Sequence, residues 1–191
     1  MNVLVLGPQG SGKGTQAKRI AAEYGIPHVS TGDMFRMAIA ADTDLGREVE
    51  PILASGSLVP DELTVAIIEA RLAEDDAQDG FVLDGFPRTL VQAEALDALL
   101  SAIGRDLDAV LFFDVPDGVA RERALGRSHE EGRPDDTPDV IDRRLAIYHA
   151  DTEPVVERYR TTGKLVPLHA GRSVNEVFAE IQTALDQVGA R

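Results

Sequence analysis

The stretch "GPQGSGKGTQ", from Gly7 to Gln16, follows the apolar run "NVLVL" (residues 2–6) and leads into "AKRIAAEYG" (17–25), whose apolar residues recur at helical spacing. Glycines at this density would destabilise a strand or a helix, because each costs about 0.5 to 1 kcal/mol in an element interior. A strand, a glycine-rich turn and a helix in this order point backbone N–H groups and a positive helix end at one place. We therefore expect a polyphosphate site formed by Gly10, Ser11, Gly12, Lys13, Gly14 and Thr15.

The general pattern G-x-x-x-x-G-K-[ST] is met at Gly7, Gly12 and Lys13. Gly14 stands where Ser or Thr is expected, and the hydroxyl comes one residue later, on Thr15. A glycine-rich turn before a helix can also be purely structural. The apolar run before the turn and the lysine inside it favour the phosphate site.

Composition limits the class of protein. A chain of 191 residues predicts one domain with a sizeable core, and without cysteine there is neither a disulfide nor a thiolate zinc site. No apolar run approaches the roughly 18 residues of a membrane span, and the N-terminus lacks the layout of a signal peptide. We expect a soluble, cytoplasmic protein. The formal net charge of −14 argues against nucleic-acid and membrane partners, whose surfaces are anionic.

Short apolar runs alternate with stretches of helical period, a pattern typical of a parallel sheet wrapped by helices. We expect strands at residues 3–6, 28–29, 81–83, 109–115 and 164–168. The sequence therefore predicts an α/β fold with a five-stranded parallel sheet flanked by helices.

Capping residues and prolines mark the ends of the expected helices. Asp61 opens one helix and Thr89 another. A long helix starts at Pro138 and is expected to bend near Pro154. The stretch "SVNE" at 173–176 is a capping box for the last helix.

Two regions depart from the alternation of strands and helices. Residues 30–59 contain two short helical patterns, "GDMFRMAIAA" and "LGREVEPILASG", with no strand between them, which predicts a helical insert. Residues 126–136, "GRSHEEGRPDD", contain no apolar residue and cannot contribute to a core. Both are candidates for moving parts over a site.

Five stretches, in chain order, carry a resemblance to a known family. They are "GPQGSGKGTQ" (7–16), "STGDMFR" (30–36), "GSLVPDE" (56–62), "LDGFPRTLVQ" (83–92) and "GRPDDTPDVIDRRL" (132–145). Over essentially its whole length the chain resembles the nucleoside monophosphate kinases of the P-loop fold, and among them the adenylate kinases with a short lid. The resemblance implies a single three-layer P-loop kinase domain. Its parts are a core of residues 1–29, 60–125 and 137–191, an insert of 30–59 that binds the nucleoside monophosphate, and a lid of 126–136.

The expected acceptor site joins the insert to the segment after the third strand. "GFPRT" (85–89) lies at the carboxyl end of that strand, where ligands of open parallel sheets bind. Arg88 and Gln92 are four residues apart, so on one helix face the first can hold a phosphate while the second reads a base. The Gln92 amide suits adenine because it can both accept and donate a hydrogen bond. Taken alone, "STGDMFR" predicts a helix that is capped by Thr31 and Asp33 and carries a solvated arginine, Arg36, one turn from its start.

The resemblance extends this acceptor site. It implies that AMP is bound by Thr31, Arg36, Ser57, Leu58, Val59, Gly85, Phe86, Pro87, Arg88, Gln92, Arg133 and Arg144. Relatives that use UMP or CMP carry other residues at the positions of Thr31 and Gln92, so the residues found here favour AMP.

Asp84 ends the third expected strand beside the phosphate loop. A carboxylate in this place commonly holds magnesium directly or through water, although a strand-terminal Asp can also simply cap the next turn. We expect Mg²⁺ to be bound with ATP, because several phosphate charges must be neutralised. Longer-lid relatives often bind zinc through cysteines in an inserted segment, and this chain has neither the segment nor the cysteines, so no zinc is expected.

Arginines are concentrated between residues 123 and 144, interleaved with acidic residues. Charge alone favours a solvated, self-paired segment of little consequence for stability. The resemblance implies instead that Arg127 binds ATP, that Arg133 and Arg144 reach the transferring phosphoryl group and AMP, and that Arg123 lies near ATP. It also implies that the donor base is held by main-chain atoms near Arg172. Arg143 is expected to face solvent.

The expected reaction is ATP + AMP ⇌ 2 ADP, which maintains the balance of adenine nucleotides. The attacking oxygen of AMP belongs to a phosphate that is already ionised, so no general base is needed. The expected catalytic residues are a cationic clamp of Lys13, Arg88, Arg127, Arg133 and Arg144. The expected partners are ATP, AMP and ADP, and the expected state is a monomer.

The residues alone are also compatible with two other functions. The nearer is a kinase with UMP or CMP as acceptor. The more distant is a nucleotide-dependent switch, for which the phosphate loop alone would serve. Guanine switches usually read their base with N-K-x-D, and the only asparagines here are Asn2 and Asn175.

Overall fold

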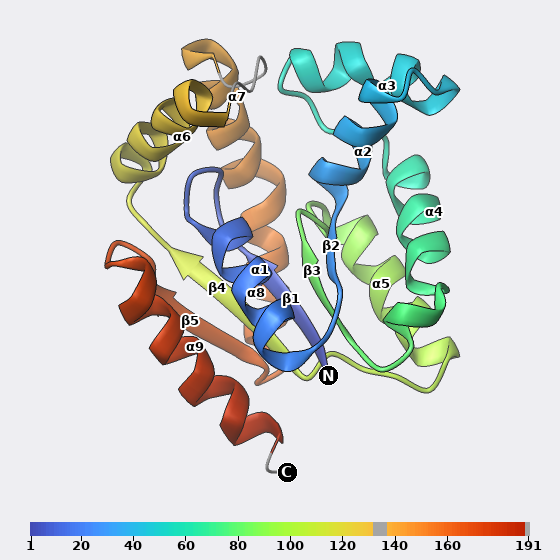
Figure 1. Ribbon diagram of the computed structural model, residues 1–191, viewed down its shortest axis with the longest axis vertical. Coiled ribbons are helices and arrows are strands. Elements are labelled where there is room, and N and C mark those ends of the chain that lie inside the picture. The colour runs from blue at the N-terminus through green and yellow to red at the C-terminus, as the bar shows by residue number, and fades with distance from the viewer. Residues whose placement is uncertain (132–136, 190–191) are drawn as a thin grey trace.

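The computed structural model describes residues 1–131 and 137–189 (Figure 1). Its strands are β1 (Asn2–Leu6), β2 (His28–Ser30), β3 (Phe81–Asp84), β4 (Ala109–Asp114) and β5 (Leu165–His169). The described helices are α1 (Lys13–Tyr24), α2 (Thr31–Ala40), α3 (Asp44–Ala54), α4 (Asp61–Leu72), α5 (Leu90–Ala102), α6 (Asp117–Glu131), α7 (Pro138–Ile147), α8 (Glu153–Arg160) and α9 (Val174–Gly189). A 3₁₀ turn η1 (Asp75–Ala77) and a π-helical segment η2 (Tyr148–Thr152) complete the elements.

The five strands form one parallel sheet in the order β2-β3-β1-β4-β5. β1 lies at its centre, where Val3 pairs with Val82 of β3 on one side and with Ala109 of β4 on the other. Because all strands run the same way, their carboxyl ends share one edge of the sheet. The phosphate loop after β1 and the segment after β3 therefore emerge side by side.

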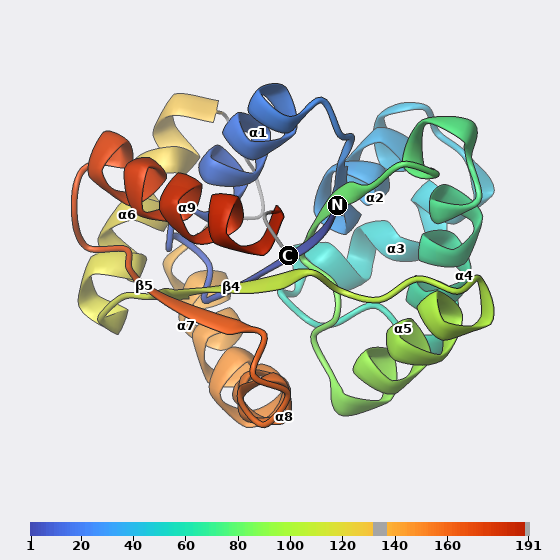
Figure 2. The ribbon, with the colours of Figure 1, turned by 90° about the horizontal axis from the view of Figure 1, so that it is seen from below.

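Helices cover both faces of the sheet, as Figure 2 shows with the sheet nearly edge-on. Val3 and Val5 of β1 belong to a core that includes Ile20 of α1 and Ile181 of α9. Leu4 and Leu6 of β1 point to the other face, where the core includes residues of α4, α5 and α8. Residues of opposite parity in β1 thus enter different cores, which is why residues 3–6 are all apolar.

Helices α2 and α3 form the insert, which rises beside the sheet at the top of Figure 1. Phe35 and Val49 form a separate small core together with Val59, and Leu63 of α4 packs against it. The insert is therefore attached to the rest of the molecule through the start of α4.

Most elements lie within one residue of the positions expected from the sequence, and the fold class is confirmed. The capping box of the last helix is formed, because the Ser173 N–H donates to Glu176 and the Glu176 N–H donates to the Ser173 hydroxyl. The Thr89 hydroxyl likewise accepts from the N–H of Gln92. These signals are local, so the sequence carries them directly.

One expectation about these elements needs correction, and two others gain detail. The cap of α2 is Ser30, whose hydroxyl accepts from the Asp33 N–H, and not Thr31 or Asp33. The expected long helix after Pro138 runs through α7, η2 and α8, and its irregular π-helical segment ends two residues before Pro154, near the expected bend. Residues 126–131, the described part of the expected lid, continue α6 as helix. Polar residues do not end a helix unless a breaker is present, and none stands between 127 and 131.

Candidate functional site

The phosphate loop lies between β1 and α1 and packs against α6. Gly10 has φ +81°, and a Cβ added to it would lie 2.0 Å from the Ala120 carbonyl oxygen, so only glycine fits. The Lys13 ammonium group donates to the Pro8 carbonyl 3.1 Å away, which places its charge over the loop. The Ser11 hydroxyl oxygen is buried and has no hydrogen-bond partner among the described residues. A bound phosphate is a group that would supply one.

Asp84 ends β3 directly beside this loop. Its carboxylate lies 3.4 Å from His28 Nε2, and a Cβ on Gly14 would lie 3.3 Å from it. Burial opposes ionisation of Asp84, but the hydrogen bond from His28 and the charges of Lys13 and Arg88 outweigh burial, so the pKa of Asp84 lies below its ordinary value. Asp84 is therefore an anion beneath the phosphate loop.

Arg88 follows β3 and lies among other guanidinium groups. Its Nε donates to the Gly85 carbonyl at 2.8 Å, and its own carbonyl accepts from the Thr152 hydroxyl at 2.9 Å. Burial and the positive charge of Arg144 lower the pKa of Arg88, while Asp84 opposes this effect. Arginine stays charged under all ordinary conditions, so the shift reflects the free-energy cost of burying this charge beside Arg144, which a bound anion would offset.

A second cavity lies between the insert and the segment after β3. Thr31, at the start of α2, donates its hydroxyl proton to the Gly85 carbonyl at 2.9 Å, and Gln92 accepts from the Arg88 N–H at 2.8 Å. The cavity that they line is completed by Leu58 and Val59, among others. Arg88 precedes α5 instead of lying on it, so it meets Gln92 through its backbone and not across a helix face.

Helix α7 reaches this site from the opposite side. Arg144 donates to the Leu53 carbonyl at 3.1 Å and lies 3.5 Å from the Gln9 side-chain oxygen. Arg143, expected to face solvent, is exposed but also donates to the Ser55 carbonyl at 3.0 Å. The end of α3 is therefore held against α7 by two arginines.

The cavity where ATP is expected to bind, called the donor cavity below, measures about 830 Å³, within the range of small-molecule sites. The phosphate loop and α6 line one part of it, and the loop after β5 lines another. Arg123 donates to the carbonyls of Ala170 and Gly171, at 2.7 and 3.3 Å, and so fixes that loop. Arg172 also lines the cavity, and its guanidinium is bonded to Glu180.

The donor cavity and the cavity around Arg88 share part of their walls. Both are lined by Lys13, Arg36, Asp84 and Arg127, among other residues. The structure thus brings two hollow sites together at a strip of mostly cationic side chains. Two ligands with anionic tails would meet at this strip.

The structure places nearly all the expected site residues around these connected cavities. The donor cavity is lined by Gly10, Ser11, Gly12, Lys13, Gly14, Thr15, Arg127 and Arg172. The acceptor side is lined by Thr31, Arg36, Ser57, Leu58, Val59, Gly85, Phe86, Pro87, Arg88, Gln92 and Arg144. The Phe86–Pro87 peptide bond is cis. Arg133 lies outside the described residues.

Sequence reasoning missed several polar neighbours of the site. His28 contacts Asp84, Gln9 contacts Arg144, and Thr152 holds the backbone of Arg88. Gln9 lies inside the phosphate-loop stretch and His28 lies on an expected strand, so their positions offered a signal. Thr152 offered none, because it belongs to the π-helical segment that interrupts an expected helix.

Among the helices that the structure describes, none is long and apolar enough to span a membrane. Within the same residues, no cluster of three or more His, Asp or Glu side chains is arranged to hold a metal ion on its own. A Mg²⁺ ion held at Asp84 would take its other ligands from water or from a bound molecule.

Comparisons with known proteins agree with this geometry. A family model described as "Adenylate kinase" matches residues 5–164. The adenylate kinase of Cyanothece sp. is 47% identical over 186 residues, which cover 97% of this chain and 95% of that protein. The adenylate kinase of Caulobacter vibrioides is 47% identical over 190 residues, which cover 100% of both chains. That of Xanthomonas campestris pv. campestris is 46% identical over 185 residues, covering 97% of this chain and 99% of that protein. The chain therefore belongs to the adenylate kinase family, whose members are phosphotransferases.

Proposed function

We propose that this chain catalyses the reversible, magnesium-dependent transfer of the terminal phosphoryl group of ATP to AMP, giving two molecules of ADP. The observation that carries the proposal is the pair of cavities joined at Lys13, Arg36, Asp84 and Arg127. A switch protein needs one nucleotide site, whereas a transfer between two nucleotides needs two sites whose phosphate ends meet.

On the acceptor side, we assign the AMP phosphate to Arg36, Arg88 and Arg144 and the base to the cavity lined by Thr31, Leu58, Val59 and Gln92. Ser57, Gly85, Phe86 and Pro87 line the same side. The resemblance to the nucleoside monophosphate kinases also assigns Arg133 to AMP binding. The guanidinium cluster supports this assignment, because burial and mutual repulsion favour a bound anion.

On the donor side, we assign the ATP phosphates to Gly10–Thr15 and Arg127, and the base to the loop around Arg172. The orphaned Ser11 hydroxyl and the Lys13 ammonium group fit a phosphate at the loop. Asp84 fits a magnesium ion bound jointly with the nucleotide, because its depressed pKa keeps it ionised and Mg²⁺ usually takes one or two carboxylates plus phosphate oxygens. When bound, the ion would supply positive charge to the phosphates.

For this reaction the protein has to place the two nucleotides in line and to supply positive charge around the migrating phosphoryl group. An oxygen of the AMP phosphate forms a bond to the γ-phosphorus of ATP as the bond to the β,γ-bridging oxygen breaks, and ADP leaves. The attacking oxygen is already ionised, so no side chain has to remove a proton. Lys13, Arg88, Arg127, Arg133 and Arg144 would stabilise the charge on the migrating group, which makes them the catalytic residues of this proposal.

We further assign residues 30–59 and 126–136 to segments that close over a core of residues 1–29, 60–125 and 137–191. The separate apolar core of the insert supports this division. Closure would exclude water, the competing acceptor, and its reversal would limit turnover. A turnover number that falls with solvent viscosity supports the assignment, whereas one that depends only on leaving-group chemistry contradicts it.

An assay across acceptors tests the proposed function. With Mg·ATP as donor, AMP should be phosphorylated with the highest kcat/KM among AMP, CMP, UMP and GMP, and ADP should form steadily. Preference for UMP or CMP would place the chain with pyrimidine-nucleotide kinases instead. Binding of one nucleotide without ADP production would favour a switch. Size-exclusion chromatography with light scattering tests the proposed monomer.

A further inference from the structure

Asp61, the first residue of α4, reaches the acceptor site although it does not line it. Its Oδ1 accepts from Gln92 Nε2 at 2.8 Å and from the Thr89 hydroxyl at 3.0 Å. Gln92 is 2% exposed, so its amide takes its partners from the surrounding protein and the cavity. Asp61 thereby links the wall at residues 57–59, which directly precedes α4, to the side chain that faces the acceptor base.

The partners of Gln92 have fixed hydrogen-bond senses. A carboxylate accepts only, so the end of the amide at Asp61 must be the NH₂ group. The Arg88 backbone N–H donates only, so the other end must be the oxygen, and that contact is 2.8 Å long. The Thr89 hydroxyl accepts from the Gln92 backbone N–H at 3.2 Å, which leaves its proton for Asp61. These contacts hold the amide in one of its two possible orientations.

This orientation leaves one N–H and one oxygen lone pair on Gln92 for the cavity. Adenine presents a ring-nitrogen acceptor beside an exocyclic amine donor, which matches that pair. A 6-oxopurine such as hypoxanthine is the same size but presents a ring N–H donor beside a carbonyl acceptor. Its ring N–H would face the N–H of the Gln92 amide, so neither donor would have an acceptor. Burying a donor without a hydrogen-bond partner makes the free energy of binding less favourable.

We propose that Asp61 is a positioning residue that makes the acceptor site selective for 6-aminopurine over 6-oxopurine nucleoside monophosphates, by fixing the orientation of the Gln92 amide. This inference rests on the proposed function, in which Gln92 faces the acceptor base. Asp61 touches neither nucleotide and acts through Gln92. Arg88 supplies the second constraint on the amide, so loss of Asp61 weakens the selectivity without abolishing it.

The test compares AMP and IMP as acceptors with Mg·ATP in wild type and in Asp61→Asn, which keeps the shape but lets either atom face Gln92. Exchanging a charged for a neutral hydrogen-bond partner should raise the IMP:AMP ratio of kcat/KM about fivefold and leave the KM for ATP within about twofold. In Asp61→Ser, a water molecule that can either donate or accept a hydrogen bond can take the place of the carboxylate. The IMP:AMP ratio should therefore shift in the same direction. Glu62→Gln is the control, since Glu62 is an exposed acidic residue of the same first turn and should leave the ratio unchanged.

A double variant separates positioning from general damage. In a Gln92→Ala background, Asp61→Asn should no longer change the IMP:AMP ratio, because the residue through which it acts is absent. The proposal is overturned if the folded Asp61 variants lower activity with AMP and IMP equally, or if their effect on the ratio survives in Gln92→Ala. Failure of the wild type to phosphorylate AMP would instead overturn the proposed function, so the two failures are distinct.

Discussion

Arg88 is held at the centre of the acceptor site by contacts of its own backbone and side chain. Its N–H, its carbonyl and its Nε are bonded to Gln92, Thr152 and Gly85 respectively. These bonds fix the direction in which the guanidinium points before any ligand arrives. Such preorganisation makes a charge effective in catalysis, because no reorganisation is needed when the transition state forms.

Replacement of Arg88 by alanine should therefore lower kcat/KM by at least about 100-fold, equivalent to roughly 2.7 kcal/mol of transition-state stabilisation, while the protein stays folded. Steady-state kinetics and thermal unfolding followed by circular dichroism measure both quantities. Arg47→Ala on α3 is the control, because Arg47 is exposed and pairs only at the surface with Asp42 and Asp44. Near-wild-type activity of Arg88→Ala would remove Arg88 from the site.

Gln92 should determine which base is accepted. Gln92→Ala removes both hydrogen-bonding atoms from the acceptor cavity, so the ratio of kcat/KM for AMP over CMP should fall by about tenfold or more. Competition between the two nucleotides in one assay gives this ratio directly. Gln78→Ala, at an exposed position where the amide bonds to the Ala73 carbonyl, should leave it unchanged. An unaltered ratio in Gln92→Ala would refute the role.

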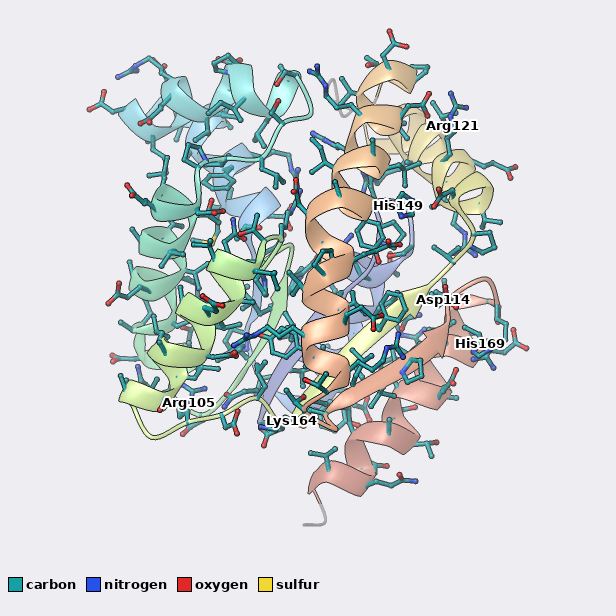
Figure 3. The ribbon with its side chains drawn as sticks, turned by 180° about the vertical axis from the view of Figure 1, so that it is seen from behind. Arg105, Asp114, Arg121, His149, Lys164 and His169 are labelled. Carbon is teal, nitrogen blue, oxygen red and sulfur yellow. The ribbon has the colours of Figure 1, made fainter. Side chains whose placement is uncertain are left out.

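At the scale of elements, α6 carries Arg127 toward the proposed site and is tied to the π-helical segment and to α7. His149 bonds through Nε2 to Asp117 of α6 at 2.9 Å and through Nδ1 to Glu153 of α8 at 2.7 Å, and Arg121 pairs with Asp142 of α7. Figure 3, which shows the molecule from behind, labels both His149 and Arg121. The bonds to Asp117 and Glu153 raise the pKa of His149 above its ordinary value. Burial raises the pKa of the neighbouring Tyr148, and the negative charges of Glu153, Asp114 and Asp117 raise it further.

A raised histidine pKa means that the imidazole binds its proton more tightly in the folded state than in the unfolded state, so protonation stabilises the folded state. Its stabilisation is complete below the unfolded pKa of about 6.5 and is lost as the pH rises through the folded pKa. His149→Gln should therefore lower Tm by a few degrees more at about pH 5.5 than at about pH 9. Because His149 is 41% exposed, solvent screening keeps this effect small.

Calorimetry of wild type and His149→Gln across this pH range checks the prediction. His169→Gln, which makes the same substitution at another exposed histidine, at the end of β5, is the matched control. Equal losses of Tm at both ends of the range would show that His149 contributes by packing and not by charge.

At the scale of the whole molecule, the fold could be predicted because its signals are local. Residues 3–6 are apolar because both faces of their strand are buried, and Thr89 and Ser173 form their caps within three residues along the chain. The membership of the adenylate kinase family, inferred from five short stretches, is confirmed by a family model that covers residues 5–164.

The parts that could not be predicted depend on contacts between distant residues. Thr152 supports Arg88 across 64 positions, and Asp61 supports Gln92 across 31. No spacing rule connects such pairs, because the sheet order and the packing of α4 against α5 bring them together. The roles of the individual site residues stay predictions, and that of Arg133 lies outside the described residues.

The central claim is that two nucleotides are bound at once, with their phosphates meeting between the two cavities. Isothermal titration with two adenosines joined through five phosphates tests it most directly. One molecule should bind per chain, with a Kd at least about 100-fold below that of AMP or ATP alone, and both nucleotides should be excluded from the complex. Weak binding, or a complex that still takes up AMP, would contradict it.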